Sequence, residues 1–175
     1  HRLGYKNIIL AGHSTGANKA VYYLYRTGDH RVRGLLLIGS LNDIAAETKR
    51  VGKKEFARIV RTTERLYRKD PSSFFWSRGF LYTARRSMSL HTPGTAEDVF
   101  PYYNSKAGWK ELKSIKIPMA LIVGSRDEHL DRPVKKLVEI FRQNSKSAKS
   151  FSGIVVKGAR HSFLGKEEEL SRAII

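Results

Sequence analysis

Short apolar runs alternate with segments of helical spacing at both ends of this chain. The apolar runs cover residues 8–11, 34–40, 119–124 and 152–157, and glycine or polar residues bound each one. Residues 17–25, 132–143 and 165–175 place apolar side chains every three to four positions, which predicts helices. A strand, a helix and a second strand in this order predict a right-handed crossover between parallel strands. The pattern therefore predicts an α/β fold, with a mostly parallel sheet and flanking helices.

The middle of the chain has a different pattern. Helical spacing recurs over residues 44–51 and 53–68, and an aromatic-rich stretch without an expected buried strand follows. A segment of this length is too long to be a simple loop between two strands of a sheet. We therefore expect a core formed by residues 1–40 and 116–175, interrupted by a helical insertion over residues 41–115.

The pentapeptide Gly12-His13-Ser14-Thr15-Gly16 stands between the first predicted strand and the first predicted helix. A serine on such a sharp turn projects its hydroxyl above the sheet, and the helix behind it offers free backbone N–H groups to a developing oxyanion. The two glycines suit a turn in which backbone crowds backbone. Ser14 is therefore a candidate nucleophile; the alternative is a glycine-rich turn whose serine only caps the helix.

A candidate acid follows the third predicted strand. Asp127 lies just past Gly124, at the carboxyl end of that strand, where α/β folds gather catalytic groups. Its expected role is to orient a histidine and stabilise the imidazolium ion. Glu128 and Asp131 are alternatives that lie farther from the strand end, and Asp131 is also placed to cap the helix of residues 132–143.

A candidate general base follows the last predicted strand. His161 lies in the loop after residues 152–157, so its ring is expected to project toward Ser14. His13 is expected to pack rather than react, and His129 follows the acid too closely to serve as its base. The remaining histidines are expected to be solvated; they are His1, His30 and His91.

These three motifs, in the order serine, aspartate, histidine, resemble the α/β-hydrolase superfamily, and in particular its esterase- and lipase-like members with a helical cap. The resemblance implies a nucleophile at Ser14, an acid at Asp127, a base at His161 and an oxyanion donor at the N–H of Thr15. It implies hydrolysis of a carboxylic ester or related small acyl substrate, with no cofactor and no metal. Thioesterases, peptidases, lactonases and acyltransferases share this machinery. The insertion of residues 41–115 would be the cap.

Members of this superfamily place several strands ahead of the nucleophile, whereas Ser14 is fourteenth here. The loop that supplies the second oxyanion donor has no counterpart in the chain. We therefore expect an upstream segment of about a hundred residues to be missing. Residues 8–10 would then form an open sheet edge that this segment or a partner chain covers.

Composition adds few constraints. The chain of 175 residues suffices for one domain, and the absence of cysteine excludes disulfides and fits a cytoplasmic location. No run approaches the roughly 20 apolar residues of a membrane span. The formal net charge is +17, and residues 49–69 hold nine basic residues and two acids. This region is expected to be a solvated helix face, with no specific nucleic-acid partner. Alternatives to an enzyme are a basic binding or scaffold domain and an inactive fragment of a hydrolase.

Overall fold

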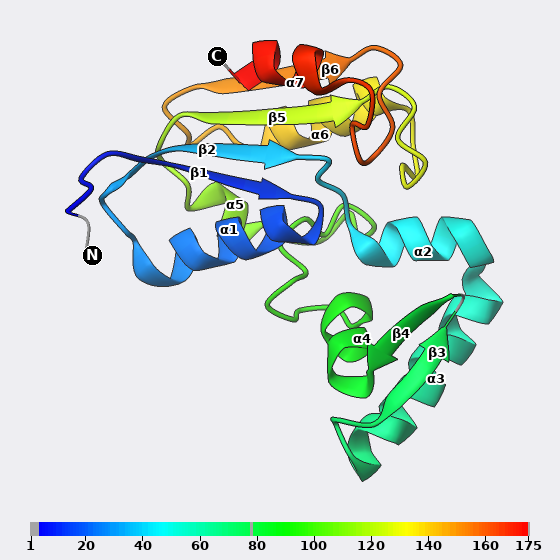
Figure 1. Ribbon diagram of the computed structural model, residues 1–175. Helices are drawn as coiled ribbons and strands as arrows, with labels where there is room; N and C mark the ends of the chain where they lie inside the picture. Colours follow the sequence, from blue (N-terminus) through cyan, green and yellow to red (C-terminus); the bar gives the residue numbers. More distant parts are fainter. Residues whose placement is uncertain (1–3, 78, 175) are drawn as a thin grey trace.

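Four parallel strands form the main sheet, in the order β1-β2-β5-β6. The computed structural model describes residues 4–77 and 79–174, and Figure 1 shows the arrangement of their elements. The strands are β1 (Ile8–His13), β2 (Val32–Ile38), β5 (Met119–Gly124) and β6 (Phe151–Val156). Because the strands are parallel and helices connect them, the predicted α/β fold class is confirmed.

Helices cover the sheet on both faces. α1 (Thr15–Thr27), α5 (Lys110–Lys113) and α6 (Val134–Asn144) lie on one face, and α7 (Glu167–Ile174) packs on the other (Figure 1). The larger apolar cluster is buried on the first face, with Leu121, Leu137 and Phe141 fully inaccessible to solvent. The smaller cluster joins Ile122 and Phe163 to partly buried residues of α7. Alternate residues of β5 thus point to opposite faces of the sheet, as its pleat requires.

The second strand begins and ends two residues earlier than the hydrophobic run predicts. β2 spans Val32–Ile38 rather than residues 34–40. Gly39 has a φ of 57°, a left-handed conformation that ends the strand and that glycine adopts without strain. Its N–H donates to the carbonyl of Ile122 at 2.8 Å, so the turn stays tied to the neighbouring strand.

β1 lies at one end of the strand order. The side chain of Ile9 is 60% exposed, while Gly12 at the other end of this strand is buried. An edge of this kind presents backbone groups to which a further strand can pair. The segment or partner expected to cover residues 8–10 stays a prediction.

The segment after β2 extends away from the sheet (Figure 1). It begins with α2 (Asp43–Val51) and α3 (Lys53–Lys69), close to the helices expected over residues 44–51 and 53–68. The aromatic-rich stretch that follows contains a hairpin, β3 (Phe74–Ser77) and β4 (Phe80–Thr83), and then α4 (Ala84–His91). The expectation of helices and loops alone is therefore wrong here, because two runs of aromatic residues favour paired strands over helix.

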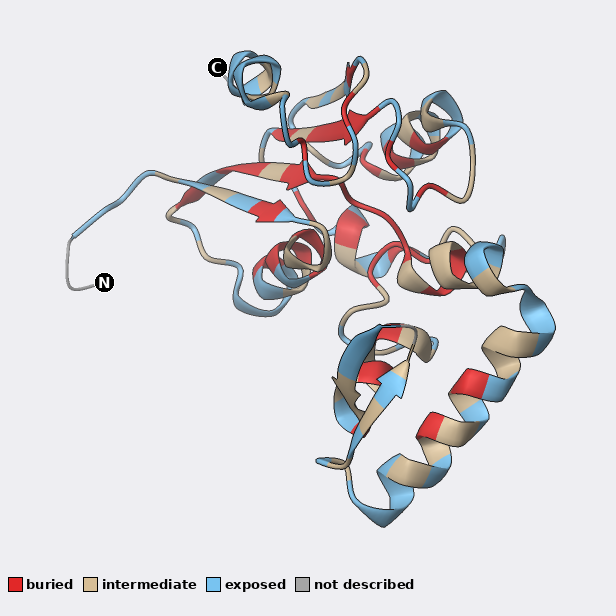
Figure 2. Cartoon of the chain, turned by 45° about the vertical axis from the view of Figure 1, so that its right-hand side comes forward, coloured by how far each residue is buried: buried red, intermediate tan, exposed pale blue. Residues whose placement is uncertain are grey.

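The last part of the expected insertion belongs to the core by its packing. Val99, Phe100 and Leu112 are almost completely buried in the same cluster as Phe141, and Phe100 lies 4.8 Å from the Phe141 ring, centroid to centroid. Figure 2 shows buried residues in the segment that runs back from α4 toward the sheet. Residues of the expected insertion from Val99 to Ile115 therefore share the main apolar cluster with the core.

The basic region forms the exposed face of α3. Arg58 pairs with Glu55 and Arg68 pairs with Glu64, each within one turn of the helix. Arg61 and Arg65 are also exposed, whereas Ile59 is buried on the opposite face. The expected helix with a solvated basic face is confirmed, and Tyr67 near its end is 38% exposed.

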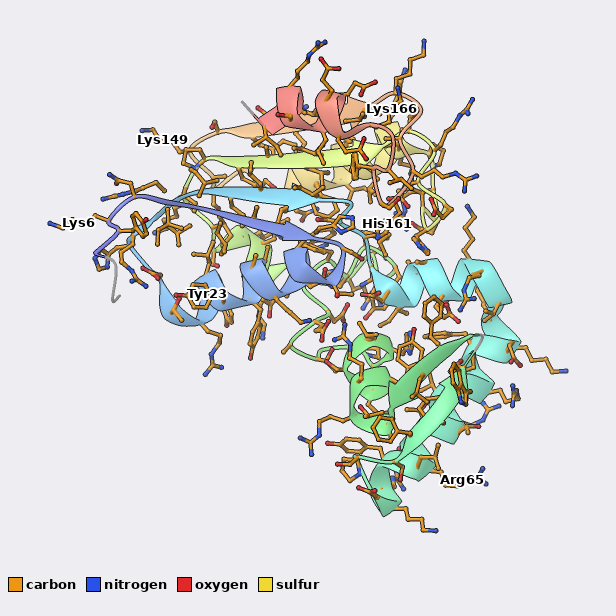
Figure 3. The ribbon with its side chains drawn as sticks, in the orientation of Figure 1. Lys6, Tyr23, Arg65, Lys149, His161 and Lys166 are labelled. Atoms are coloured by element: carbon orange, nitrogen blue, oxygen red, sulfur yellow. The ribbon has the colours of Figure 1, made fainter. Side chains whose placement is uncertain are left out.

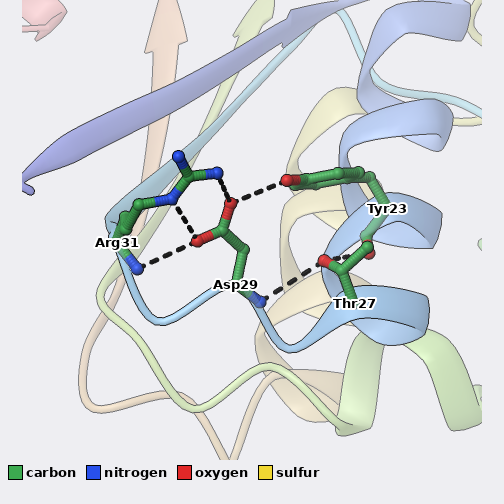
Figure 4. A network of polar contacts seen from close by, with 4 residues as sticks. All are labelled: Tyr23, Thr27, Asp29 and Arg31. Atoms are coloured by element: carbon green, nitrogen blue, oxygen red, sulfur yellow. Dashed lines mark hydrogen bonds and ion pairs between the residues drawn. The ribbon is translucent and has the colours of Figure 1, made fainter. Parts of the chain in front are cut away.

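A polar network fixes the turn between α1 and β2, at the end of the sheet opposite the carboxyl ends of the strands (Figure 4). Asp29 accepts two hydrogen bonds from the Arg31 side chain, at 2.9 and 2.6 Å, and one from the Tyr23 hydroxyl at 2.7 Å. The Arg31 guanidinium holds the pKa of the Asp29 carboxyl well below its usual range. This network therefore stabilises the turn at the end of the sheet that lies away from Ser14, Asp127 and His161.

Candidate functional site

Ser14 occupies a strained turn between β1 and α1. Its φ of 56° and ψ of −128° lie in a region that residues other than glycine rarely adopt. Its N–H donates to the carbonyl of Ile38 at 2.8 Å, which holds the turn against β2. A Cβ on Gly12 would lie only 2.4 Å from the carbonyl oxygen of Gly16, so glycine is required where the chain folds back on itself. The pentapeptide thus makes the sharp turn that its sequence predicts.

The amino end of α1 lies directly behind this serine. Thr15 is the first residue of the helix, and backbone amides in a first helical turn have no carbonyl acceptor within the helix. No acidic side chain occupies this turn. The positive end of the helix dipole therefore favours negative charge next to Ser14, as an oxyanion site requires.

Asp127 and His161 meet after β5 and β6. The Nδ1 atom of His161 lies 2.8 Å from Oδ2 of Asp127, and the aspartate side chain has no solvent exposure. The other carboxylate oxygen, Oδ1, accepts the backbone N–H of His129 at 2.9 Å. Two residues 34 positions apart in the sequence are thus joined, because neighbouring parallel strands end at the same edge of the sheet.

The two alternative acids have other partners. Glu128 accepts the backbone N–H of His161 at 3.1 Å, so it contacts the loop and not the imidazole ring, and its pKa is lowered chiefly by a hydrogen bond from its own backbone N–H. Asp131 pairs with Arg132, and α6 begins at Val134 without any side-chain cap. Asp131 is therefore not the cap that the sequence predicts, because it turns toward Arg132 instead.

Two further histidines, His13 and His129, contact the ring of His161. His13 Nε2 lies 2.8 Å from the backbone oxygen of His161, and the two rings are 5.0 Å apart. His129 packs edge-on against the His161 ring, with centroids 4.6 Å apart. The sequence did not place either residue beside His161. His13 was expected to pack, and it contacts the rings of His161 and Phe163 but is itself exposed. Both limit where the His161 ring can move.

A pocket of 180 Å³ opens between the carboxyl ends of the strands and α2. Ser14, His129 and His161 line one side, and residues of α2, β4 and α4 line the other. Figure 3 labels His161 at the end of the sheet that faces α2. His91 also lines the pocket, and burial lowers its pKa, so the expectation that it is solvated is wrong. His30 is exposed, as expected, and His1 lies outside the described residues.

Residues 4–77 and 79–174 contain neither a cluster of metal-ligating side chains nor a helix able to span a membrane. No group of three or more His, Asp or Glu side chains in this part of the chain is arranged to hold a metal ion. Within the same described ranges, no helix combines the length and apolarity needed to cross a bilayer.

Solved structures with the same fold are enzymes of several kinds. A monoacylglycerol lipase from Paleococcus ferrophilus aligns with a TM-score of 0.62 and 21% identity, over 99% of this chain and 68% of that one. The esterase EaEST from Exiguobacterium antarcticum gives 0.55 and 17%, over 99% and 67%. The carboxylesterase CesB from Bacillus subtilis gives 0.52 and 18%, over 98% and 60%. The fold of this chain is therefore the α/β-hydrolase fold.

Sequence comparisons give a family without an assigned activity. No curated protein matches the chain. A family model described as "Protein of unknown function (DUF1749)" matches residues 2–175, which is nearly the whole sequence. The chain therefore belongs to the DUF1749 family.

Proposed function

We propose that this protein is a serine hydrolase that cleaves carboxylic esters or related small acyl substrates. The observation that carries the proposal is the contact of 2.8 Å between Asp127 and His161, on the wall of a pocket that Ser14 also lines. A nucleophile on a strained turn, a histidine and a buried acid are the three groups that acyl transfer through a serine requires.

The chemistry follows from the hydrogen bonds. Asp127 accepts the Nδ1–H of His161, so Nε2 is left without a proton and can take one from the Ser14 hydroxyl. The serine oxygen then attacks the substrate carbonyl, and the negative charge develops beside the Thr15 N–H at the amino end of α1. His161 returns the proton to the leaving group. Water deprotonated by the same histidine later releases the acyl group from Ser14.

The names of the structural neighbours agree with this reaction class. A lipase, an esterase and a carboxylesterase share the fold, and each name denotes hydrolysis of an ester bond. Their identity to this chain, 17–21%, is too low to transfer a substrate. The proposal therefore rests on the residues of this site, and the neighbours add a precedent for the fold.

We further propose that residues 41–98 act as a cap over the pocket, which shortens the insertion expected from the sequence. α2, β4 and α4 supply the pocket wall that faces Ser14 and His161. A cap of this kind excludes water from the acyl-enzyme and shapes the space available to the substrate.

A fluorophosphonate probe is expected to label Ser14. The probe reacts with serines that a neighbouring base activates, and phosphonylation leaves the probe covalently attached to Oγ. Peptide mapping by mass spectrometry locates the modified residue. Denatured protein serves as the control, since unfolding separates Ser14 from His161. Labelling that is absent from the folded protein, or equal in the folded and denatured samples, would contradict the proposed function.

Replacement of Gly124 is expected to disturb the site through the backbone. A Cβ at this position would lie 2.4 Å from the carbonyl oxygen of Ala159 and 2.9 Å from that of Arg160, so Gly124→Ala pushes the His161 loop away from Asp127. We expect a loss of about 1–3 kcal/mol in the free energy of unfolding and a decrease of about 10²-fold in kcat/KM for 4-nitrophenyl acetate.

The matched control for this variant is Gly108→Ala. A Cβ there meets no atom within 4 Å, so thermal unfolding and turnover are expected to stay near wild type. Equal behaviour of the two variants would show that the contact between the strand end and the His161 loop does not position the histidine.

A further inference from the structure

The wall of the pocket opposite the triad is one face of α2. Asp43, Glu47 and Arg50 all line the pocket, and their spacing of three to four residues places them on the same side of this helix. This polar face of α2 lines the same pocket as Ser14 and His161. Whatever part of the substrate extends beyond the reacting carbonyl therefore meets charged groups.

The charges on this face do not balance. Arg50 donates two hydrogen bonds to Glu47, at 2.8 and 2.7 Å, so these two side chains neutralise one another. Arg86, nearby on α4, is held by Glu97. Within residues 4–77 and 79–174, the Asp43 carboxylate has no side-chain hydrogen-bond donor and no ion pair. It is the unpaired charge of the pocket.

The surroundings of Asp43 explain why this charge matters. Burial, followed by the charge of Glu97, raises the pKa of Asp43 to about 7, even though Arg86 and His161 act in the opposite direction. A carboxylate that is short of positive partners gains from any cation that enters the pocket. The rest of the chain carries an excess of positive charge, so this local deficit runs against the overall balance.

Aromatic rings complete the wall. Phe80 and Tyr82 of β4 and His91 of α4 line the pocket beside α2. Burial lowers the pKa of His91, so at neutral pH its ring is uncharged and provides no counter-ion for Asp43. Ring faces attract cations, and they do so more strongly in a pocket that excludes water. Carboxylate and ring faces together form a site for an ammonium group.

We propose that the substrate carries an ammonium group, which binds between the Asp43 carboxylate and the ring of Tyr82 while Ser14 attacks the carbonyl. The inference rests on the proposed hydrolase function and names its substrate class. Asp43 is then a specificity-determining residue rather than a participant in proton transfer. Esters with long, uncharged chains would leave its charge unpaired in the pocket.

The test compares charged esters with neutral esters of the same shape. Acetylcholine and 3,3-dimethylbutyl acetate differ by a trimethylammonium group in the alcohol, and 4-nitrophenyl 5-(dimethylamino)pentanoate and 4-nitrophenyl 6-methylheptanoate differ by an amine in the acyl chain. We expect kcat/KM to favour the charged member of at least one pair by about tenfold or more. Equal turnover within both pairs overturns the inference but leaves the hydrolase proposal standing. No turnover of any ester would contradict the proposed function itself.

A variant assigns the preference to Asp43. Asp43→Asn keeps the size of the side chain and removes its charge, so the preference for the charged ester is expected to fall to near unity. Asp70→Asn removes the same charge from an exposed acid at the end of α3, and the preference is expected to persist. If Asp43 only stabilises the first turn of α2, its variant lowers thermal stability but leaves the ratio of the two rates unchanged.

The pH dependence in the wild-type protein gives a test that needs no variant. The preference is expected to decline as pH falls through about 7, because protonated Asp43 no longer attracts a cation. Charged groups that act on Asp43 are Glu97, Arg86 and His161, and Tyr82 and Tyr102 are coupled to its charge. The other charged or titratable side chains that line the same pocket are Glu47, Arg50, His91 and His129. A neutral ester with a hydroxyl at the same position provides the last comparison, and equal preference for it would overturn the ammonium assignment.

Discussion

Ser14→Ala is expected to decrease kcat for ester hydrolysis by about 10⁴–10⁶-fold. The variant removes the oxygen that forms the acyl-enzyme but leaves the Asp127–His161 pair and the amino end of α1 in place. The residual rate then comes from substrate binding and oxyanion stabilisation alone. Steady-state kinetics with 4-nitrophenyl acetate, at protein concentrations high enough to detect the slow variant, measure the decrease.

The same position offers a matched test of stability. Ser14 holds a positive φ that costs a residue with a Cβ about 1–3 kcal/mol, and glycine adopts this conformation freely. Ser14→Gly is therefore expected to lose activity as fully as the alanine variant while its melting temperature rises. A loss of activity accompanied by unfolding in both variants would mean that Ser14 has a structural role, and retention of activity would exclude it as the nucleophile.

The strained turn at Ser14 is the reason that the fold and the candidate site could be predicted together. A strained turn requires glycines around Ser14 and an apolar strand before it, so the sequence displays both the strand and the candidate nucleophile. The parallel strands then fix where Asp127 and His161 lie, because these residues belong to the loops that follow β5 and β6. The meeting of these two side chains depends on topology that the strand–helix alternation already implies.

The pocket wall opposite the proposed catalytic residues could not be predicted in the same way. Asp43 and His91 are ordinary polar residues in the sequence, and only the assembled fold places them in the same pocket as Ser14. The aromatic runs of β3 and β4 did not indicate strands for a related reason. Their strands pair with each other and not with the main sheet, so they lack the fully apolar character that marks a buried strand.

The extent of the segment that projects from the sheet also depends on packing that the sequence does not display. Phe100 and Leu112 look no different in the sequence from the aromatic and aliphatic residues around them, yet both are completely buried in the main core. Their partners, such as Phe141, lie far away in the sequence. Contacts of this range follow from the assembled fold rather than from any local pattern.

Asp127→Asn is expected to decrease kcat by about 10⁴-fold, which corresponds to about 5.4 kcal/mol in the activation barrier. An asparagine that presents its NH₂ group to Nδ1 of His161 moves the imidazole proton to Nε2, and the ring then cannot accept the proton of Ser14. The Asp127 side chain is fully buried, so no solvent replaces the lost acceptor. Kinetics at a single pH, with the fold checked by circular dichroism, give the decrease.

Two other acids in the same loop serve as controls and settle which carboxylate orients the base. Asp131→Asn removes a charge that is paired with Arg132 rather than with the imidazole of His161, so it is expected to change kcat by less than about threefold. Glu128→Gln keeps an acceptor for the His161 backbone N–H and is expected to have a similarly small effect. If Asp131→Asn or Glu128→Gln instead abolishes turnover while Asp127→Asn remains active, the acid of the site is a different residue and the loop must rearrange when substrate binds.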